Sequence, residues 1–313
     1  MARLTDAATP LTGPAADRKG VLLVLLATGF FSLGGILVRL TQGASGWQII
    51  FYRALSLTAA MLVLLAFRYR DHIAEAIRSA GWNGVLAGTA ASATLVSFVL
   101  ALQEISVANT IFMTGLAPFI AALLGRVFLG ERISAVTWAA MVLAGVGVVV
   151  MVADAVSFDE LYGNVLALTY AVSLALMSVF LRRGRRSDML PASLISGVIA
   201  SALAFVVLVA DDDKAGFGFA VSARDLGLCM MMGMVQLGGG LFCYTLGARH
   251  VPAAQLQLLG MVELVLSPLW VWLFLGHAPP QAVFLGGLLI LSATVMQVVA
   301  SGSVRRAAPA TNV

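Results

Sequence analysis

Hydrophobic residues occur along this chain in long unbroken runs. Each run has about twenty residues, enough for a helix to cross the hydrocarbon core of a bilayer. The runs do not alternate between apolar and polar positions, so they are not typical of transmembrane β-strands. Charged residues, glycine and proline separate them, and they predict ten membrane-spanning helices. The predicted spans cover residues 20–40, 46–67, 80–102, 106–128, 134–152, 161–181, 190–210, 224–246, 252–275 and 281–300.

The composition supports the same fold class. The 313 residues are 60% hydrophobic and 11% charged, whereas a soluble domain has about 25% charged residues. The predicted loops are short apart from 68–79 and 211–223, which leaves no stretch that could fold as a soluble domain. We therefore expect an all-α membrane protein whose surroundings are the lipid bilayer.

The basic residues predict the topology, because cytoplasmic loops are enriched in arginine and lysine. With the N-terminus in the cytoplasm, 15 of the 19 basic residues fall on the cytoplasmic side, and both termini lie there. Residues 1–19 are expected to form a disordered cytoplasmic tail and residues 301–313 a second cytoplasmic tail. The compact loops and the preference for arginine over lysine suggest a bacterial inner membrane.

Several kinds of function lack a basis in the sequence. The net charge of +4 comes from loop residues without an aromatic-interleaved basic face, so no nucleic-acid partner is predicted. Cys229 and Cys243 lie within apolar runs and are interpreted as small core residues. No phosphate-binding loop or zinc-protease motif occurs, and we expect neither a cofactor nor a metal.

Two pairs of segments indicate an internal repeat. Gly20 to Arg39 resembles Gly163 to Arg182 at an offset of 143 residues, and Phe128-Leu129-Gly130 recurs as Phe274-Leu275-Gly276 at an offset of 146. Chance similarity between two Leu/Ala/Val-rich spans is the alternative. The preserved order and the nearly equal offsets favour a repeat.

The repeat divides the chain into two units of five spans each, residues 20–152 and 161–300. Because five is odd, the two halves must cross the membrane in opposite directions. Two inverted five-helix repeats are a common plan for secondary transporters, whose substrate site lies near the midplane between the halves. Alternate exposure of that site to the two sides would transport a small molecule.

Five short motifs, in order along residues 20–300, resemble a known family. They are Trp-Gln-Ile-Ile-Phe-Tyr-Arg at 47–53, Leu-Ala-Pro-Phe at 116–119, Phe-Leu-Gly-Glu-Arg-Ile-Ser at 128–134, Val-Glu-Leu at 262–264 and Phe-Leu-Gly-His-Ala-Pro at 274–279. Together they resemble the drug/metabolite transporter superfamily, in its EamA-type ten-helix group. This resemblance implies gradient-driven export or uptake of amino acids and other small metabolites, without ATP.

The sequence departs from the family pattern at two positions. His277 stands where the family usually has a glutamate, which weakens the idea of two paired loop acids. Leu264 stands where a proline often follows the glutamate of the ninth span, and Pro268 comes four residues later. We therefore expect the kink of the ninth span to be displaced towards Pro268.

Glu263 is the main candidate for substrate binding or coupling. It lies about eleven residues into a run of 24 and therefore near the middle of the bilayer. An ionised carboxylate at that depth is costly unless it is paired, wetted or protonated. It could pair with a substrate ammonium or carry a coupling proton; a protonated carboxyl bonded to a neighbouring helix is the structural alternative.

Arg53 is expected about 10 Å into the second span. The guanidinium could bind a substrate carboxylate, but we favour a structural role in which it reaches the outer headgroups or braces a backbone carbonyl.

Neutral polar residues on several spans could line a pocket for a polar substrate or could link helices. The fourth and ninth spans carry the related pairs Asn109 with Thr110 and Gln255 with Gln257. Ser32, Tyr170, Gln236 and Tyr244 complete the candidates.

Two further features have alternative interpretations. Gly238-Gly239-Gly240 in the eighth span permits either a hinge or close helix packing. Glu131 and Arg132 are interpreted as a solvated cap that also marks the cytoplasmic side.

The predicted function is secondary active transport of small organic metabolites such as amino acids or their derivatives, with export favoured and proton coupling possible through Glu263. An uptake carrier for a vitamin, a nucleoside or a metabolite like S-adenosylmethionine is the alternative within this class. A membrane-embedded enzyme acting on lipid-linked substrates is the alternative from another class, and a sensor or scaffold is a third.

Overall fold

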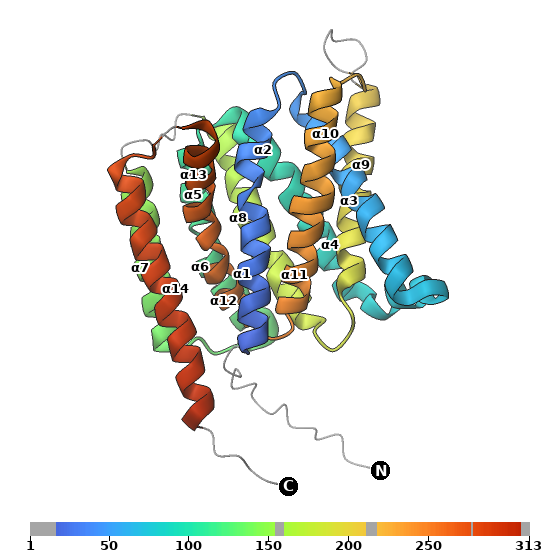
Figure 1. Cartoon of the computed structure of the whole chain (residues 1–313). Helices are drawn as coiled ribbons and strands as arrows, with labels where there is room; N and C mark the ends of the chain where they lie inside the picture. The colour runs from blue at the N-terminus through green and yellow to red at the C-terminus, as the bar shows by residue number, and fades with distance from the viewer. Residues whose placement is uncertain (1–16, 154–159, 211–217, 277, 308–313) are drawn as a thin grey trace, which may run out of the picture.

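The computed structural model describes residues 17–153, 160–210, 218–276 and 278–307, and every regular element within them is a helix (Figure 1). Ten helical stretches of these residues are long and apolar enough to cross a membrane, as predicted. They are Arg18–Leu40, Gly46–Tyr69, Ile73–Glu104, Asn109–Leu129, Ala135–Val152, Leu161–Arg183, Leu190–Ala210, Ala223–Gly247, Ala253–Phe274 and Gln281–Ala300.

Four of the ten spans are divided into shorter helices. In chain order the helices are α1 (Arg18–Ser32), α2 (Gly34–Leu40), α3 (Gly46–Tyr69), the short 3₁₀ helix η1 (Arg70–His72), α4 (Ile73–Glu104), α5 (Val107–Thr114), α6 (Ala117–Leu129), α7 (Ala135–Val152), α8 (Leu161–Arg183), α9 (Leu190–Ala210), α10 (Ala223–Met231), the π-helix η2 (Met232–Gly239), α11 (Gly240–Gly247), α12 (Ala253–Gly260), α13 (Val262–Leu275) and α14 (Gln281–Ala307).

The described chain begins and ends at the same end of the bundle. In Figure 1, α1 starts and α14 finishes at the bottom, which we call the lower end; the α8–α9 connection also lies there. The α2–α3 connection and the start of α14 lie at the opposite, upper end. This arrangement follows from ten spans that alternate in direction.

Contacts between the two halves are reciprocal. The third span, α4, packs against α8, which is the sixth span, and the eighth span packs in the same way against α1 through α11. The second span packs against the seventh as α3 against α9, and the fifth against the tenth as α7 against α14. Such reciprocity is expected of two halves related by a two-fold axis.

The fourth and ninth spans break at equivalent positions. In the fourth span, α5 ends at Thr114 and α6 begins at Ala117. In the ninth span, α12 ends at Gly260 and α13 begins at Val262. These positions agree with the offset of 146 residues within one residue. The break of the ninth span thus precedes Pro268, which lies inside α13. Gly260 marks the break because glycine has a low helix propensity.

The prediction of a long loop at residues 68–79 was wrong, because most of these residues are helical. Helix α4 begins at Ile73, and Gly81, with φ of +57°, bends it before it enters the bundle. Ala76 and Ala80 are buried, one helical turn apart, so this first part of α4 packs its apolar side against the protein. At the C-terminus, α14 extends to Ala307 into the segment expected to be a tail.

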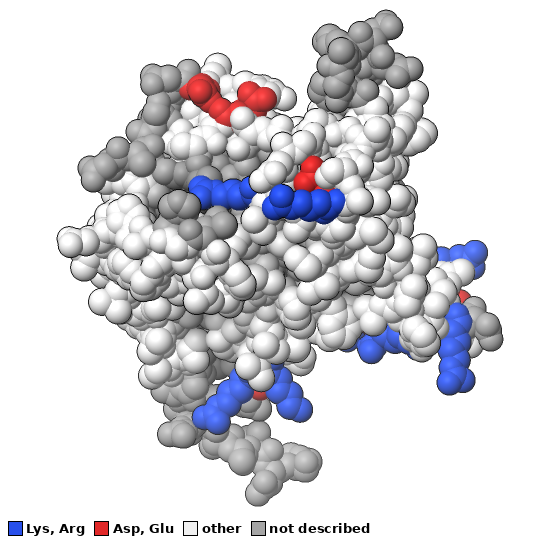
Figure 2. All heavy atoms as spheres, turned by 45° about the horizontal axis from the view of Figure 1, so that its top comes forward, with Lys and Arg blue, Asp and Glu red and all other residues white. Residues whose placement is uncertain are grey.

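Large apolar side chains cover the outside of the bundle. Examples that are more than half exposed include Val63, Leu123, Val206, Leu288 and Val299. Figure 2 shows a mostly uncharged surface between charged residues that gather towards the ends. An apolar surface of this extent requires lipid around it.

Candidate substrate site

A cavity of about 370 Å³ lies between α2, α4, α5, α8 and α13 and reaches residues 278–283 at the upper end. Most of its wall is apolar, with Phe98, Leu102, Ile111 and Val271 among the lining residues. Pockets of this size, apolar with a few polar groups, are typical of small-molecule sites.

A second, smaller chamber of about 60 Å³ adjoins the first. Phe98, Tyr170 and Glu263 line both spaces, and the chamber adds Arg53 and Gln236 from α3 and η2. These three shared residues therefore separate an apolar cavity from a chamber that contains a buried cation.

Glu263 lies in the first turn of α13, directly after the break in the ninth span. Its side chain is partly exposed, and among the described residues it is the only acid that lines either space. The start of a half-helix directs unpaired backbone N–H groups towards the midplane, which favours negative charge there. Glu263 therefore lies in the wall of both spaces, next to the break in the ninth span.

Arg53 does not reach the outer surface as expected. It is 4% exposed, and its Nε and Nη1 atoms have no hydrogen-bond partner among the described residues. The guanidinium carbon lies 5.7 Å from the centre of the Phe98 ring, a cation–π arrangement. The face of α3 that carries Arg53 packs against the eighth span, which a depth estimate along one helix could not reveal.

The π-helix η2 brings the eighth span close to α3. A Cβ atom on Gly233 would lie 2.2 Å from the Arg53 carbonyl oxygen, so only glycine allows this approach. Within η2, Gln236 donates a hydrogen bond from Nε2 to the Phe31 carbonyl at 3.3 Å, and its Oε1 has no partner among the described residues. The glycine run ahead of α11 also packs tightly, because a Cβ atom on Gly240 would meet the Phe31 ring at 2.2 Å.

Half of the predicted site residues line the two spaces. Thr110 and Tyr170 line the larger cavity with Glu263, and Arg53 and Gln236 line the chamber. The other five predicted residues line neither space; they are Ser32, Asn109, Tyr244, Gln255 and Gln257.

Most of these excluded residues link helices instead. Gln257 donates hydrogen bonds to the Leu174 carbonyl at 2.9 Å and to the Tyr244 hydroxyl at 3.0 Å, which ties α12 to α8 and α11. Asn109 donates to Asn164 on α8 at 3.2 Å. These contacts match the alternative in which the neutral polar groups hold the bundle together.

Ser32 has a comparable role at the α1–α2 junction. Its hydroxyl accepts a hydrogen bond from the Trp270 indole at 2.8 Å, and its carbonyl accepts one from the Ser267 hydroxyl at 3.1 Å. Sequence reasoning missed Ser267, Thr114 and Phe98 as lining residues. An aromatic or hydroxyl residue within an apolar run carries no signal that separates a cavity wall from a lipid-facing side.

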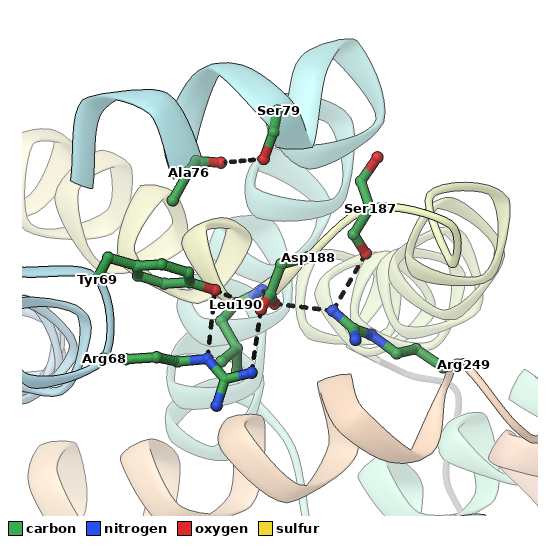
Figure 3. A network of polar contacts seen from close by, with 8 residues as sticks. All are labelled: Arg68, Tyr69, Ala76, Ser79, Ser187, Asp188, Leu190 and Arg249. Carbon is green, nitrogen blue, oxygen red and sulfur yellow. Dashed lines mark hydrogen bonds and ion pairs between the residues drawn. The ribbon is translucent and has the colours of Figure 1, made fainter. Parts of the chain in front are cut away.

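At the lower end, charged residues from both halves are paired. Asp188 accepts hydrogen bonds from the Tyr69 hydroxyl and, at 3.1 Å, from the Leu190 backbone, and it forms ion pairs with Arg249 at 2.9 Å and Arg68 at 3.3 Å (Figure 3). Partial burial alone would raise the pKa of this carboxyl, but the hydrogen bonds and the two guanidinium charges outweigh it, so the pKa of Asp188 is lowered.

Glu131 takes part in a second ion pair at this end. Its Oε1 accepts from Arg182 Nε at 3.1 Å, and its Oε2 accepts from the Ala253 backbone N–H at the start of α12 at 3.2 Å. The side chains of Arg182 and Glu131 are 3% and 12% exposed. Glu131 is therefore not the solvated cap that was expected.

The main cavity lies towards the upper end of the bundle, whereas the paired charges lie at the lower end. The chain matches the EamA-like transporter family twice, over residues 18–153 and 161–299.

The chain belongs to the EamA-like transporter family. It is 27% identical to a pseudopaline exporter of Pseudomonas aeruginosa over 282 residues, covering 89% of this chain and 95% of the relative. It is also 27% identical to a riboflavin transporter of Rhizobium johnstonii, covering 90% of this chain and 91% of the relative. A crystal structure that shares 16% identity superposes with a TM-score of 0.72 over 91% of this chain and 98% of its own. The protein is thus a multi-pass membrane transporter of small metabolites rather than an enzyme.

Proposed function

We propose that this protein exports a small metabolite that carries a positively charged amine, in exchange for protons that bind at Glu263. The observation that carries this proposal is the carboxyl of Glu263, which lines both the main cavity and the chamber and forms no ion pair with another described residue. The alternating exposure of this site is expected to involve opposite movements of two inverted repeats, residues 20–152 and 161–300.

The coupling follows from the cost of charge within the membrane. An ionised carboxylate near the midplane is costly unless a cation pairs with it, and Arg53, which lines the same chamber, forms no ion pair with Glu263 among the described residues. A bound proton and a bound ammonium group can each neutralise Glu263, but not both together. Substrate and proton would therefore cross the membrane in opposite directions, and an inward proton gradient would drive the substrate outward.

The orientation is proposed from the arginines. The lower end carries Arg68, Arg182, Arg183, Arg185, Arg186 and Arg249. By the positive-inside rule this end faces the cytoplasm, so the cavity opens outwards and both termini are cytoplasmic. The pseudopaline exporter relative supports export, and a bacterial inner membrane suits this topology.

Counterflow in proteoliposomes tests the proposal. Vesicles loaded with unlabelled compound would be assayed with labelled amino acids, nucleosides, riboflavin and S-adenosylmethionine. We expect saturable exchange of an amine-bearing compound, lost in Glu263→Gln and retained in Glu104→Gln, a matched change at an exposed position outside both spaces. Exchange of riboflavin that is unchanged in Glu263→Gln would contradict the proposal and favour a vitamin carrier.

A further inference from the structure

The chamber next to Glu263 contains a positive charge that exchange of an amine for a proton does not use. Arg53 is 4% exposed, and two of its three guanidinium nitrogens lack any hydrogen-bond partner among the described residues. Leaving a charged donor unpaired in a buried site is costly, and the cation–π contact with Phe98 compensates only part of that cost. The free donors therefore point to a ligand group that carries negative charge.

Glu263 cannot supply that group in this structure. Both residues line the chamber of about 60 Å³, yet no hydrogen bond or ion pair within 4.0 Å joins them in the described residues. A space of this size holds a few heavy atoms, and the main cavity of about 370 Å³ beside it is large enough for the remainder of a metabolite. Two opposite charges thus face a shared space without contacting each other.

We propose that Arg53 binds a carboxylate of the transported metabolite while Glu263 binds its amine. This inference rests on the proposed function, which assigns the amine to Glu263. An α-amino acid, or a derivative with both groups free, carries the two opposite charges a few bonds apart and fits between them. The guanidinium is suited to this role because its planar donors match the two oxygens of a carboxylate.

The apolar lining of the main cavity restricts the class of substrate further. Phe98, Leu102, Ile111 and Val271 surround the space beyond the two charges. An apolar or aromatic side chain on the substrate would be buried there, whereas a charged side chain would lose its hydration. The combined site therefore selects zwitterions with an apolar side chain.

Matched ligand pairs test the carboxylate subsite. L-leucine and 3-methylbutylamine, or L-phenylalanine and 2-phenylethylamine, differ only by the carboxylate. Their binding to the full-length protein in detergent would be measured by calorimetry, which avoids passive movement of amines across vesicles. The wild type is expected to bind each amino acid about 10- to 100-fold more tightly than its amine, the contribution of a charge-assisted hydrogen-bond pair.

Substitution of Arg53 then tests whether this residue causes the preference for the amino acid over the amine. Arg53→Gln should reduce this ratio to about 1, because the carboxylate of the amino acid loses its charged partner. Arg126→Gln removes an arginine at an exposed position outside both spaces, and should keep the wild-type ratio. An unchanged ratio in Arg53→Gln would overturn the inference. So would a wild-type ratio near 1, which needs no variant and is decisive even if Arg53→Gln fails to fold.

Other results separate this inference from the proposed function. Equal binding of amine and amino acid, abolished in Glu263→Gln, would overturn the carboxylate subsite and leave amine exchange standing. Stabilisation by chloride that depends on Arg53, without amino-acid binding, would assign the chamber to an inorganic anion and overturn the inference. Absence of binding by every pair at millimolar concentration would also overturn it, and the counterflow panel would then decide the proposed function alone.

Discussion

Gly233 shows how a single residue controls the position of the Arg53 backbone. A Cβ atom there would lie 1.7 Å from the Ser56 hydroxyl oxygen and 2.2 Å from the Arg53 carbonyl oxygen. Any side chain must therefore push the eighth span away from α3. The glycine has a packing role because η2 and α3 approach backbone to backbone.

Gly233→Ala is expected to destabilise the protein by about 1–3 kcal/mol through overpacking. The measurement is the thermal unfolding midpoint of purified protein in detergent. Gly227→Ala, six residues earlier in the same span, is a matched control, because a Cβ atom there meets nothing within 4 Å. That control should be neutral or stabilising by up to about 1 kcal/mol, and equal midpoints for the two variants would contradict the packing argument.

The sequence could identify a site residue where its depth in the membrane was sufficient evidence. Glu263 could be identified because an acid in the middle of a long apolar run has few structural explanations. Arg53 could not be placed, because its environment depends on which face of α3 meets η2. Tyr244 and Gln257 are polar residues on spans like the others, and only the packing shows that they bond to each other outside the cavities.

Among the helices, the lower end depends on ion pairs that join the two halves. Glu131 connects the end of the fourth span to Arg182 on α8 and to the start of α12. Both partners are nearly buried, so removing one charge leaves the other without compensation.

Glu131→Gln should lower the free energy of unfolding by about 3–5 kcal/mol, the usual cost of breaking a buried ion pair. Chemical or thermal denaturation in detergent measures the loss. Glu75→Gln is the control, because Glu75 pairs with His72 in a contact where both side chains are more than 70% exposed. This exposed pair should contribute at most about 1 kcal/mol, and a similarly small effect of Glu131→Gln would show that the inner pair does not hold the helices.

The Asp188 pairs should depend on pH in a defined direction. The pKa of this carboxyl in the folded protein lies below its ordinary value of 3.8. Its stabilising effect is therefore complete above about pH 4 and is lost as the pH falls through the lowered pKa. The difference in unfolding midpoint between wild type and Asp188→Asn should be constant from pH 5 to 8 and shrink only below pH 4. A difference that disappears between pH 5 and 7 would contradict this prediction.

For the helices, the sequence predicted the ten spans better than the breaks within them. The ten spans follow from run length and differ from the structure by a few residues at most ends. The breaks at Gly115 and Met261 lie inside apolar runs, where periodicity does not change. The repeat offset of 146 residues, however, pairs Gly115 with Met261 and could have located the second break from the first.

In the molecule as a whole, the cavity and the charge pairs lie towards opposite ends. The main cavity reaches the upper end, and the pairs centred on Glu131 and Asp188 close the lower end. Transport by alternating access would require the lower pairs to separate while the upper end closes. The overall architecture and family were predictable from the sequence, whereas the end of the bundle that the cavity reaches was not, because it depends on how helices from both halves pack around it.

The central claim is that substrate and proton compete for Glu263, and proton release on binding tests it most directly. Purified protein in lightly buffered detergent near neutral pH would be mixed with the substrate found by counterflow, and a pH indicator would record the protons released. The account predicts release of up to about one proton per bound substrate at saturation, set by the fraction of Glu263 that is protonated beforehand, and none for Glu263→Gln. Binding to the wild type without proton release, or equal release from Glu263→Gln, would contradict it.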